Sequence, residues 1–192
     1  RMRSGRTVTI DALSHEGLLE DQGRDPVAYF ASKGVPAAQV LQDGIDIAKS
    51  YARHTRSFDV DGPHIVTGPI HVDSARPGDV LKVQINRIVP RAYGTNFNVP
   101  GMFGQFPKDY ADGQVKYLYL DLDRKRIEFI PGVFIPLAPF PGTIGVARKE
   151  PGRYSSVPPG EYAGNIDIRD LIEGTTLYVP VHVAGALLWT GD

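Results

Sequence analysis

The stretch Leu177–Asp192, LYVPVHVAGALLWTGD, decides the fold class of this chain. Between Thr176 and Trp189 most residues are β-branched or large and apolar, and Gly185 is the only glycine that interrupts them. A run of this kind is typical of one or two buried strands. The last residue, Asp192, therefore comes directly after a predicted core strand. Chain ends commonly consist of polar, poorly ordered residues instead.

The composition indicates a globular chain with a small or neutral partner. Its 192 residues, 42% of them hydrophobic and 22% charged, suffice for one sizeable core. The 21 basic and 22 acidic residues nearly cancel and form no run of like charge, which argues against binding to nucleic acid or to an anionic membrane. The absence of cysteine excludes disulfides, thiolate metal sites and thiol nucleophiles, and it fits a cytoplasmic protein.

Turn-forming residues predict a mainly β protein. The 21 glycines and 16 prolines divide the chain into short segments, which favours strands over helices. Beyond the closing stretch, strand patterns occur in Thr7–Leu13, His64–Val72, Asp79–Val89, Val115–Asp123 and Arg126–Leu137. Apolar residues recur at helical spacing only in Pro36–Arg53, and Tyr93–Gln114 resembles a long loop of the kind that borders binding sites.

The segment SHEG (14–17) places His15 and Glu16 directly after a predicted strand. A strand end is a rigid position for a metal ligand or a base. Neighbouring side chains on an extended strand point to opposite faces, so both residues serve one site only if the backbone turns, as Gly17 permits. The alternative is an ordinary surface His-Glu pair.

The segment GNIDIRDL (164–171) alternates polar and apolar residues. On an extended backbone, Asn165, Asp167 and Arg169 would share one face and the two isoleucines would enter the core. Such a row of polar groups suits amide binding or support of a metal ligand, and an exposed face with an Asp167–Arg169 pair is the alternative. The nearby serines lack a G-x-S-x-G elbow, which gives an acyl-serine mechanism little support.

The remaining histidines and glycines give no local motif. His71 and His182 lie within apolar strands, where a hydrogen-bonded core imidazole explains them, and His54 follows the predicted helix on a solvated stretch. His64 begins a predicted strand and either packs or faces a cleft. No short-range metal-ligand spacing and no phosphate-binding glycine loop occur, so a metal site has to be assembled from distant segments.

Three long stretches resemble the acetamidase/formamidase family of amide hydrolases. They are GPHIVTGPIHVDSARPGDVLKVQI (62–85), IPLAPFPGTIGVA (135–147) and SSVPPGEYAGNIDIRDLIEGTTLYVPVHVAGALLWTGD (155–192), in the family's order and at similar separations. The SHEG segment with LLEDQGRDPVAYF (18–30) is similar to a branch that includes γ-lactamases. In this family the Gly-Asp that matches Gly191 and Asp192 leads into a further segment. The resemblance therefore implies that residues 1–192 form the N-terminal portion of one unit whose C-terminal part this chain lacks.

The resemblance also implies a fold and a chemistry. We expect a β-sandwich or barrel-like fold with a few helices, and zinc or another divalent metal that activates water for attack on a small linear or cyclic carboxamide. His15 and Asp192 are the expected metal ligands, Glu16 the expected general acid or base, and Asn165 and Asp167 are expected to bind the amide or support the metal. The expected partners are the amide, the missing C-terminal part, present in the same or a separate chain, and further copies in a homo-oligomer.

Two departures and two alternatives accompany these expectations. SHEG differs from the form common in other branches of the family, so a ligand role for His15 is not simply inherited from them. His71 and His182 stand where many relatives have an aromatic residue.

The alternatives to an enzyme are a non-catalytic small-molecule-binding protein on the same fold, since fold does not dictate function, and a structural fragment or oligomerisation half.

Overall fold

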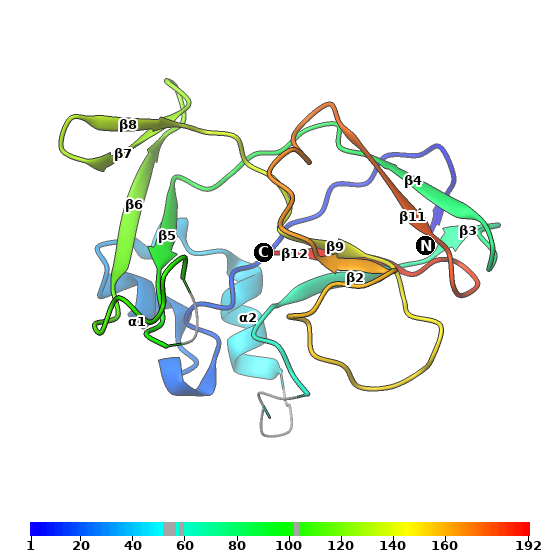
Figure 1. Ribbon diagram of the computed structural model, residues 1–192, viewed down its shortest axis with the longest axis horizontal. Coiled ribbons are helices and arrows are strands. Elements are labelled where there is room, and N and C mark those ends of the chain that lie inside the picture. The colour runs from blue at the N-terminus through cyan, green and yellow to red at the C-terminus, as the bar shows by residue number, and fades with distance from the viewer. Residues whose placement is uncertain (52–56, 58–59, 102–103) are drawn as a thin grey trace.

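The computed structural model of the chain describes residues 1–51, 57, 60–101 and 104–192 (Figure 1). Within these residues the chain forms twelve strands in four sheets and two α-helices. The prediction of a mainly β protein with a few helices is confirmed. None of the helices in the described part of the chain is both long and apolar enough to cross a membrane.

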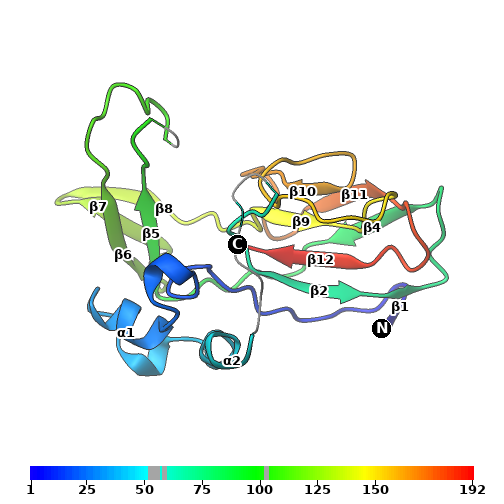
Figure 2. The ribbon, with the colours of Figure 1, turned by 90° about the horizontal axis from the view of Figure 1, so that it is seen from below.

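A β-sandwich occupies one side of the molecule. Its larger sheet is antiparallel, in the order β10-β9-β12-β2, and a two-stranded ribbon of β4 and β11 faces it (Figure 2). The buried residues between the two layers include Ile144, Val146, Val179 and Leu188. The strands are β2 (Val66–Ile70), β4 (Val80–Gln84), β9 (Thr143–Gly145), β10 (Ala163–Asn165), β11 (Thr176–Pro180) and β12 (Leu188–Gly191), and β1 (Met2–Arg3) pairs with β3 (Val72–Asp73) beside them.

The helices and a second four-stranded sheet occupy the other side. Phe30, Val35 and Val40 form the buried cluster of this part, and Tyr93 packs against it. Figure 2 shows the C-terminus between the two parts of the molecule. The sheet runs β5 (Tyr93–Phe97), β6 (Val115–Asp121), β7 (Arg126–Ile130) and β8 (Val133–Pro136), and the helices are η1 (Glu20–Gln22), α1 (Pro26–Ala31), η2 (Ala37–Gln39) and α2 (Gln42–Ser50).

The closing stretch forms two strands, as its apolar run predicts. β11 pairs with β4, and β12 lies between β2 and β9 in the middle of the larger sheet. Between the two strands, Val181 and Ala186 are buried in the core of the sandwich. This central position of β12 fixes the place at which Asp192 leaves the sheet.

Three segments differ from the prediction. Thr7–Leu13 runs beside β2 without a backbone ladder in the described residues, and its Asp11 carbonyl instead accepts a 3.0 Å hydrogen bond from the Thr67 hydroxyl. The helix predicted over Pro36–Arg53 is interrupted, because Val40 and Leu41 adopt extended backbone angles that bury Val40 in the cluster around Phe30. The predicted loop Tyr93–Gln114 opens with β5, and its Met102 and Phe103 lie outside the described residues.

Candidate functional site

His64 and Asp192 meet because two strands place them at one end of the larger sheet. His64 precedes β2 and Asp192 follows β12, and these strands are antiparallel with Gly191 opposite Val66. The Nε2 atom of His64 lies 3.9 Å from the Oδ2 atom of Asp192. The His64 side chain is 10% exposed, whereas that of Asp192 is 42% exposed. The pair therefore joins a nearly buried imidazole to an accessible carboxylate.

A second carboxylate, that of Asp167, converges on the same place. A Cβ added at Gly142 would lie 2.8 Å from Oδ1 of Asp167 and 2.9 Å from Oδ2 of Asp192, so both carboxylates approach the Gly142 backbone. Partial burial raises the pKa of Asp167, the negative charge of Asp192 raises it further, and His64 acts in the opposite sense. Two carboxylates and an imidazole therefore come together at this end of the larger sheet.

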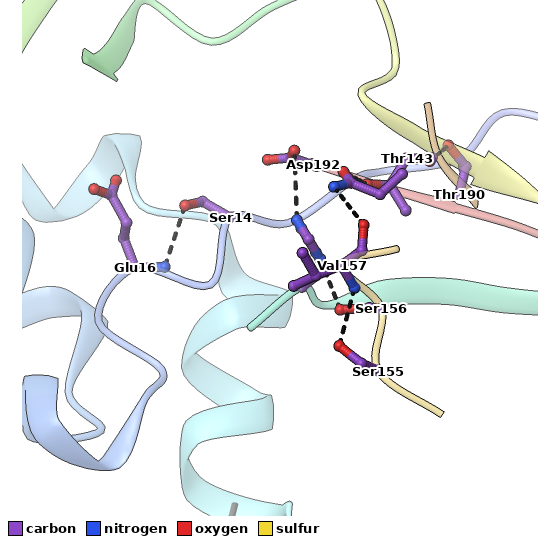
Figure 3. Close-up of polar contacts among 10 residues, drawn as sticks. Ser14, Glu16, Thr143, Ser155, Ser156, Val157, Thr190 and Asp192 are labelled. Carbon is purple, nitrogen blue, oxygen red and sulfur yellow. Dashed lines mark hydrogen bonds and ion pairs between the residues drawn. The ribbon is translucent and has the colours of Figure 1, made fainter. Parts of the chain in front are cut away.

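Ser156 contacts the other nitrogen of the His64 ring. Its hydroxyl oxygen lies 2.7 Å from Nδ1 of His64 (Figure 3). Ser156 is packed so tightly on Gly62 that a Cβ added there would lie 1.8 Å from its hydroxyl oxygen. The loop is also tied down where Arg153 donates a 2.8 Å hydrogen bond to Asp61. With the hydroxyl at Nδ1, the Nε2 atom is the nitrogen that faces Asp192.

The side chain of Asn165 supports the loop that carries Ser156. The Thr143 hydroxyl donates to its Oδ1 at 3.0 Å, and its Nδ2 donates to the Val157 carbonyl at 3.0 Å. The expected row of polar groups from Asn165 to Arg169 is wrong, because β10 ends at Asn165 and Asp167 has a left-handed φ of 46°. As a result Ile168 is 46% exposed instead of buried.

The SHEG segment forms a turn that separates its two candidate residues. The Leu18 backbone N–H donates to the His15 carbonyl at 3.0 Å, and Gly17 has a φ of 75°. The ring centroids of His15 and His64 are 6.5 Å apart, edge to face. Figure 3 shows the Glu16 carboxylate on the far side of Ser14 from Asp192.

Glu16 lies instead in a cavity of about 270 Å³ between the turn, the helices and β5. The residue is only 8% exposed. Burial raises the pKa of its carboxyl, while hydrogen bonds from the Thr95 and Ser14 hydroxyls and the nearby Lys33 charge lower it. The roles expected for His15 and Glu16 stay predictions, and the structure gives the two residues different surroundings.

The donors of the site fit a divalent metal in part. The 3.9 Å between Nε2 of His64 and Oδ2 of Asp192 is somewhat longer than the roughly 3.3 Å between neighbouring donors at tetrahedral zinc. In the described part of the chain, however, no three His, Asp or Glu side chains form a group that could hold a metal ion. The chain thus offers two donors of the correct kind, with Asp167 beside them.

Sequence reasoning left His64 open between packing and a cleft, and the structure places His71 away from it. His71 packs on Gly185, and its Nδ1 atom lies 3.5 Å from Asp73 on another part of the sandwich. His54 lies outside the described residues. The available signal for His64 was its position at the head of a strand, but its partner becomes evident only once β2 and β12 are paired.

Comparisons with known proteins converge on one family. A sequence model of the acetamidase/formamidase family matches residues 39–155 and 149–192. The chain is 27% identical to the acetamidase of Mycolicibacterium smegmatis, over 73% of this chain and 49% of that protein. It is 34% identical to the solved acetamidase of Bacillus halodurans, with a TM-score of 0.61, over 66% of this chain and 42% of that one.

A γ-lactamase from Delftia acidovorans shares the fold. Its TM-score is 0.56 at 24% identity, over 66% of this chain and 44% of that one. The chain spans less than half the length of each of these three proteins.

Proposed function

The chain belongs to the acetamidase/formamidase family, and from this premise we propose that the protein is a metal-dependent hydrolase of small carboxamides. The substrates are linear amides of the formamide or acetamide type, or a small cyclic amide such as a γ-lactam. The observation that carries the proposal is the His64–Asp192 pair, 3.9 Å apart at the ends of β2 and β12, with Ser156 behind the imidazole.

Amide hydrolysis requires an activated water, stabilisation of the negative charge that develops on the carbonyl oxygen, and an acid for the departing nitrogen. Zinc, when bound, would activate the water and polarise the carbonyl. His64 and Asp192 would hold it. The ligand role expected for His15 stays a prediction, since its ring lies edge to face with that of His64 and no three ligand-type side chains form a metal-binding group among the described residues. A donor from the rest of the unit would complete the set.

The protein groups around these ligands would supply orientation and proton transfer. Ser156 would fix the His64 ring so that Nε2 faces the substrate side. Asp167, which lies beside Asp192 at Gly142, would carry a proton between the attacking water and the leaving nitrogen. Asn165 would act through the loop that it ties to Thr143.

The test uses the full-length protein and two histidine variants. Formamide, acetamide and 2-pyrrolidinone are followed by NMR, and zinc is measured by mass spectrometry on the same samples. We expect His64→Ala to lower kcat/KM at least about 100-fold and to lower the zinc content, because it removes a ligand. His71→Ala, a histidine on another part of the sandwich, is the matched control and should change neither.

Two outcomes would contradict the proposal. If the His64→Ala variant hydrolyses the amides as fast as the wild-type protein does, the His64–Asp192 pair takes no part in the reaction. A zinc-loaded wild-type protein that hydrolyses none of the amides would favour the non-catalytic binding protein. Homo-oligomerisation stays a prediction, which light scattering on the same full-length protein checks.

A further inference from the structure

Thr143 occupies a central position beside the candidate site. It is the first residue of β9 and is completely buried, with an exposed fraction of 0%. In the larger sheet it lies between two partners, Asn165 of β10 on one side and Gly191 of β12 on the other. Because Gly191 directly precedes Asp192, Thr143 is paired with the strand end that carries this candidate ligand.

A row of hydrogen bonds crosses these three strands. The Thr190 hydroxyl of β12 donates to the Thr143 carbonyl at 2.9 Å, and the Thr143 hydroxyl donates to Oδ1 of Asn165 at 3.0 Å. Figure 3 shows Thr143 and Thr190 next to Asp192. A hydroxyl that donates to the oxygen of an amide leaves the amide NH₂ group to donate elsewhere. The Thr143 hydroxyl therefore sets which end of the Asn165 amide faces β9.

The NH₂ group of Asn165 extends the row into the neighbouring loop. Its Nδ2 atom donates to the Val157 carbonyl at 3.0 Å. Val157 follows Ser156, whose hydroxyl oxygen lies 2.7 Å from Nδ1 of His64. The row thus begins on the strand that leads to one candidate ligand and ends beside the residue that contacts the other.

We propose that Thr143 is a positioning residue for the candidate site. Its hydroxyl holds the Asn165 amide in the orientation that fixes the place of Ser156. Through this row, the strand that carries Asp192 and the loop that orients His64 keep a constant separation. The inference rests on the proposed function, in which His64 and Asp192 hold the metal, and it deepens that function with a buried residue that acts through its neighbours.

Loss of the Thr143 hydroxyl would disturb the amide that it orients. Oδ1 of Asn165 would lose this donor, and an acceptor in a part-buried place is costly to leave without a partner. We therefore expect the amide to turn toward another donor and to weaken its bond to the Val157 carbonyl. A hydroxyl that only stabilised the fold would change the free energy of unfolding and leave the zinc affinity as it is.

Competition with a chromophoric chelator on the full-length protein measures the zinc affinity of each variant. Thr143→Val removes the hydroxyl at nearly constant shape and should weaken zinc binding about three- to tenfold, because outer partners of metal ligands affect the affinity. Thr143→Ser keeps the hydroxyl and should stay within about twofold of the wild-type protein. Thr175→Val is the matched control, since the Thr175 hydroxyl donates to the Ile172 carbonyl at 2.7 Å outside the row, and it should leave the affinity unchanged.

A double-mutant cycle with Ser156→Ala tests the route. If the Thr143 hydroxyl acts through Ser156, Thr143→Val should weaken zinc binding by less than about twofold once Ser156→Ala is present, because coupled residues give non-additive effects. Equal losses with and without Ser156→Ala would mean that the two hydroxyls act independently, and they would overturn the inference.

The same measurements separate this inference from the proposed function. Wild-type zinc affinity in Thr143→Val, together with weakened binding in His64→Ala, would overturn the inference and leave the proposed function standing. Unchanged affinity in His64→Ala would contradict the proposed function, and the inference with it. Urea unfolding verifies that each variant is folded. If Thr143→Val does not fold, Asn165→Ala removes the same link and should show the same loss and the same cycle with Ser156→Ala.

Discussion

At the scale of single residues, the Ser156 hydroxyl decides which nitrogen of His64 faces Asp192. Nδ1 of the imidazole is 2.7 Å from the hydroxyl, and Nε2 is left on the side of the carboxylate. A histidine that binds a metal through one nitrogen is commonly oriented by a hydrogen bond at the other nitrogen. Under the proposed function, Ser156 would therefore act as a positioning residue for His64 and not as a nucleophile.

Replacing Ser156 by alanine should reduce zinc affinity about 10- to 100-fold, because His64 loses the group that orients its ring. Competition with a chromophoric chelator on the full-length protein measures this affinity independently of turnover. Ser156→Thr keeps a hydroxyl at the same position and should restore most of the loss. Wild-type zinc affinity in Ser156→Ala would show that the hydroxyl only packs against Gly62.

The sequence predicts the residue types of this site better than their arrangement. Asp192 and Asp167 are both candidates from their segments, and the structure places their carboxylates together at Gly142. His64 could not be chosen over His71 or His182, since its approach to Asp192 depends on the pairing of β2 with β12, more than a hundred residues apart in the chain. Local spacing contains no information about such a pairing.

At the scale of elements, the loop around Ser156 depends on the absence of a side chain at Gly62. Alanine there would place its Cβ 1.8 Å from the Ser156 hydroxyl oxygen and 2.8 Å from the Ser156 backbone nitrogen. Because the backbone has to move, we expect Gly62→Ala to lower the free energy of unfolding by about 1–3 kcal/mol. The midpoints of urea-induced unfolding, compared between proteins with equal m values, measure the change.

Gly44, inside α2, provides the matched control. Its added Cβ would have only Leu13 within reach, at 4.0 Å, which is ordinary van der Waals contact. Gly44→Ala should therefore raise the free energy of unfolding by about 0.5–1 kcal/mol, because alanine loses less backbone freedom on folding. Equal unfolding midpoints for the two variants would mean that the loop around Ser156 is not held by this contact.

The strands were more predictable than the helices, for a physical reason. Alternating patterns correctly indicated the segments of β2, β4 and β6, each of which pairs along a sheet. Arg126–Leu137 formed a hairpin, with Gly132 at a φ of 78° in its turn. Helix α1 was missed because it has only six residues, although Asp25 accepts from the Ala28 N–H and Pro26 occupies its first turn.

At the scale of the whole molecule, the chain spans less than half the length of the three proteins compared with it, and its candidate site has too few donors. His64 and Asp192 supply two donors, and no group of three ligand-type side chains that could hold a metal occurs among the described residues. Structural zinc sites use four ligands, and catalytic ones commonly use three protein ligands with one open position. A tight site therefore needs donors in addition to His64 and Asp192.

We accordingly expect the 192-residue chain alone to bind zinc much more weakly than a full-length protein of the relatives' size. Loss of one protein ligand should weaken the affinity by at least about tenfold, since each ligand contributes to a binding free energy of about 10–16 kcal/mol at structural zinc sites. Chelator competition on both proteins, each with His64→Ala as a blank, measures the difference. If the chain alone binds zinc as tightly as the full-length protein, and His64→Ala abolishes that binding, its own residues complete the metal site. If His64→Ala leaves the zinc affinity of the full-length protein unchanged, the metal lies elsewhere, and the pairing of β2 with β12 serves the fold alone.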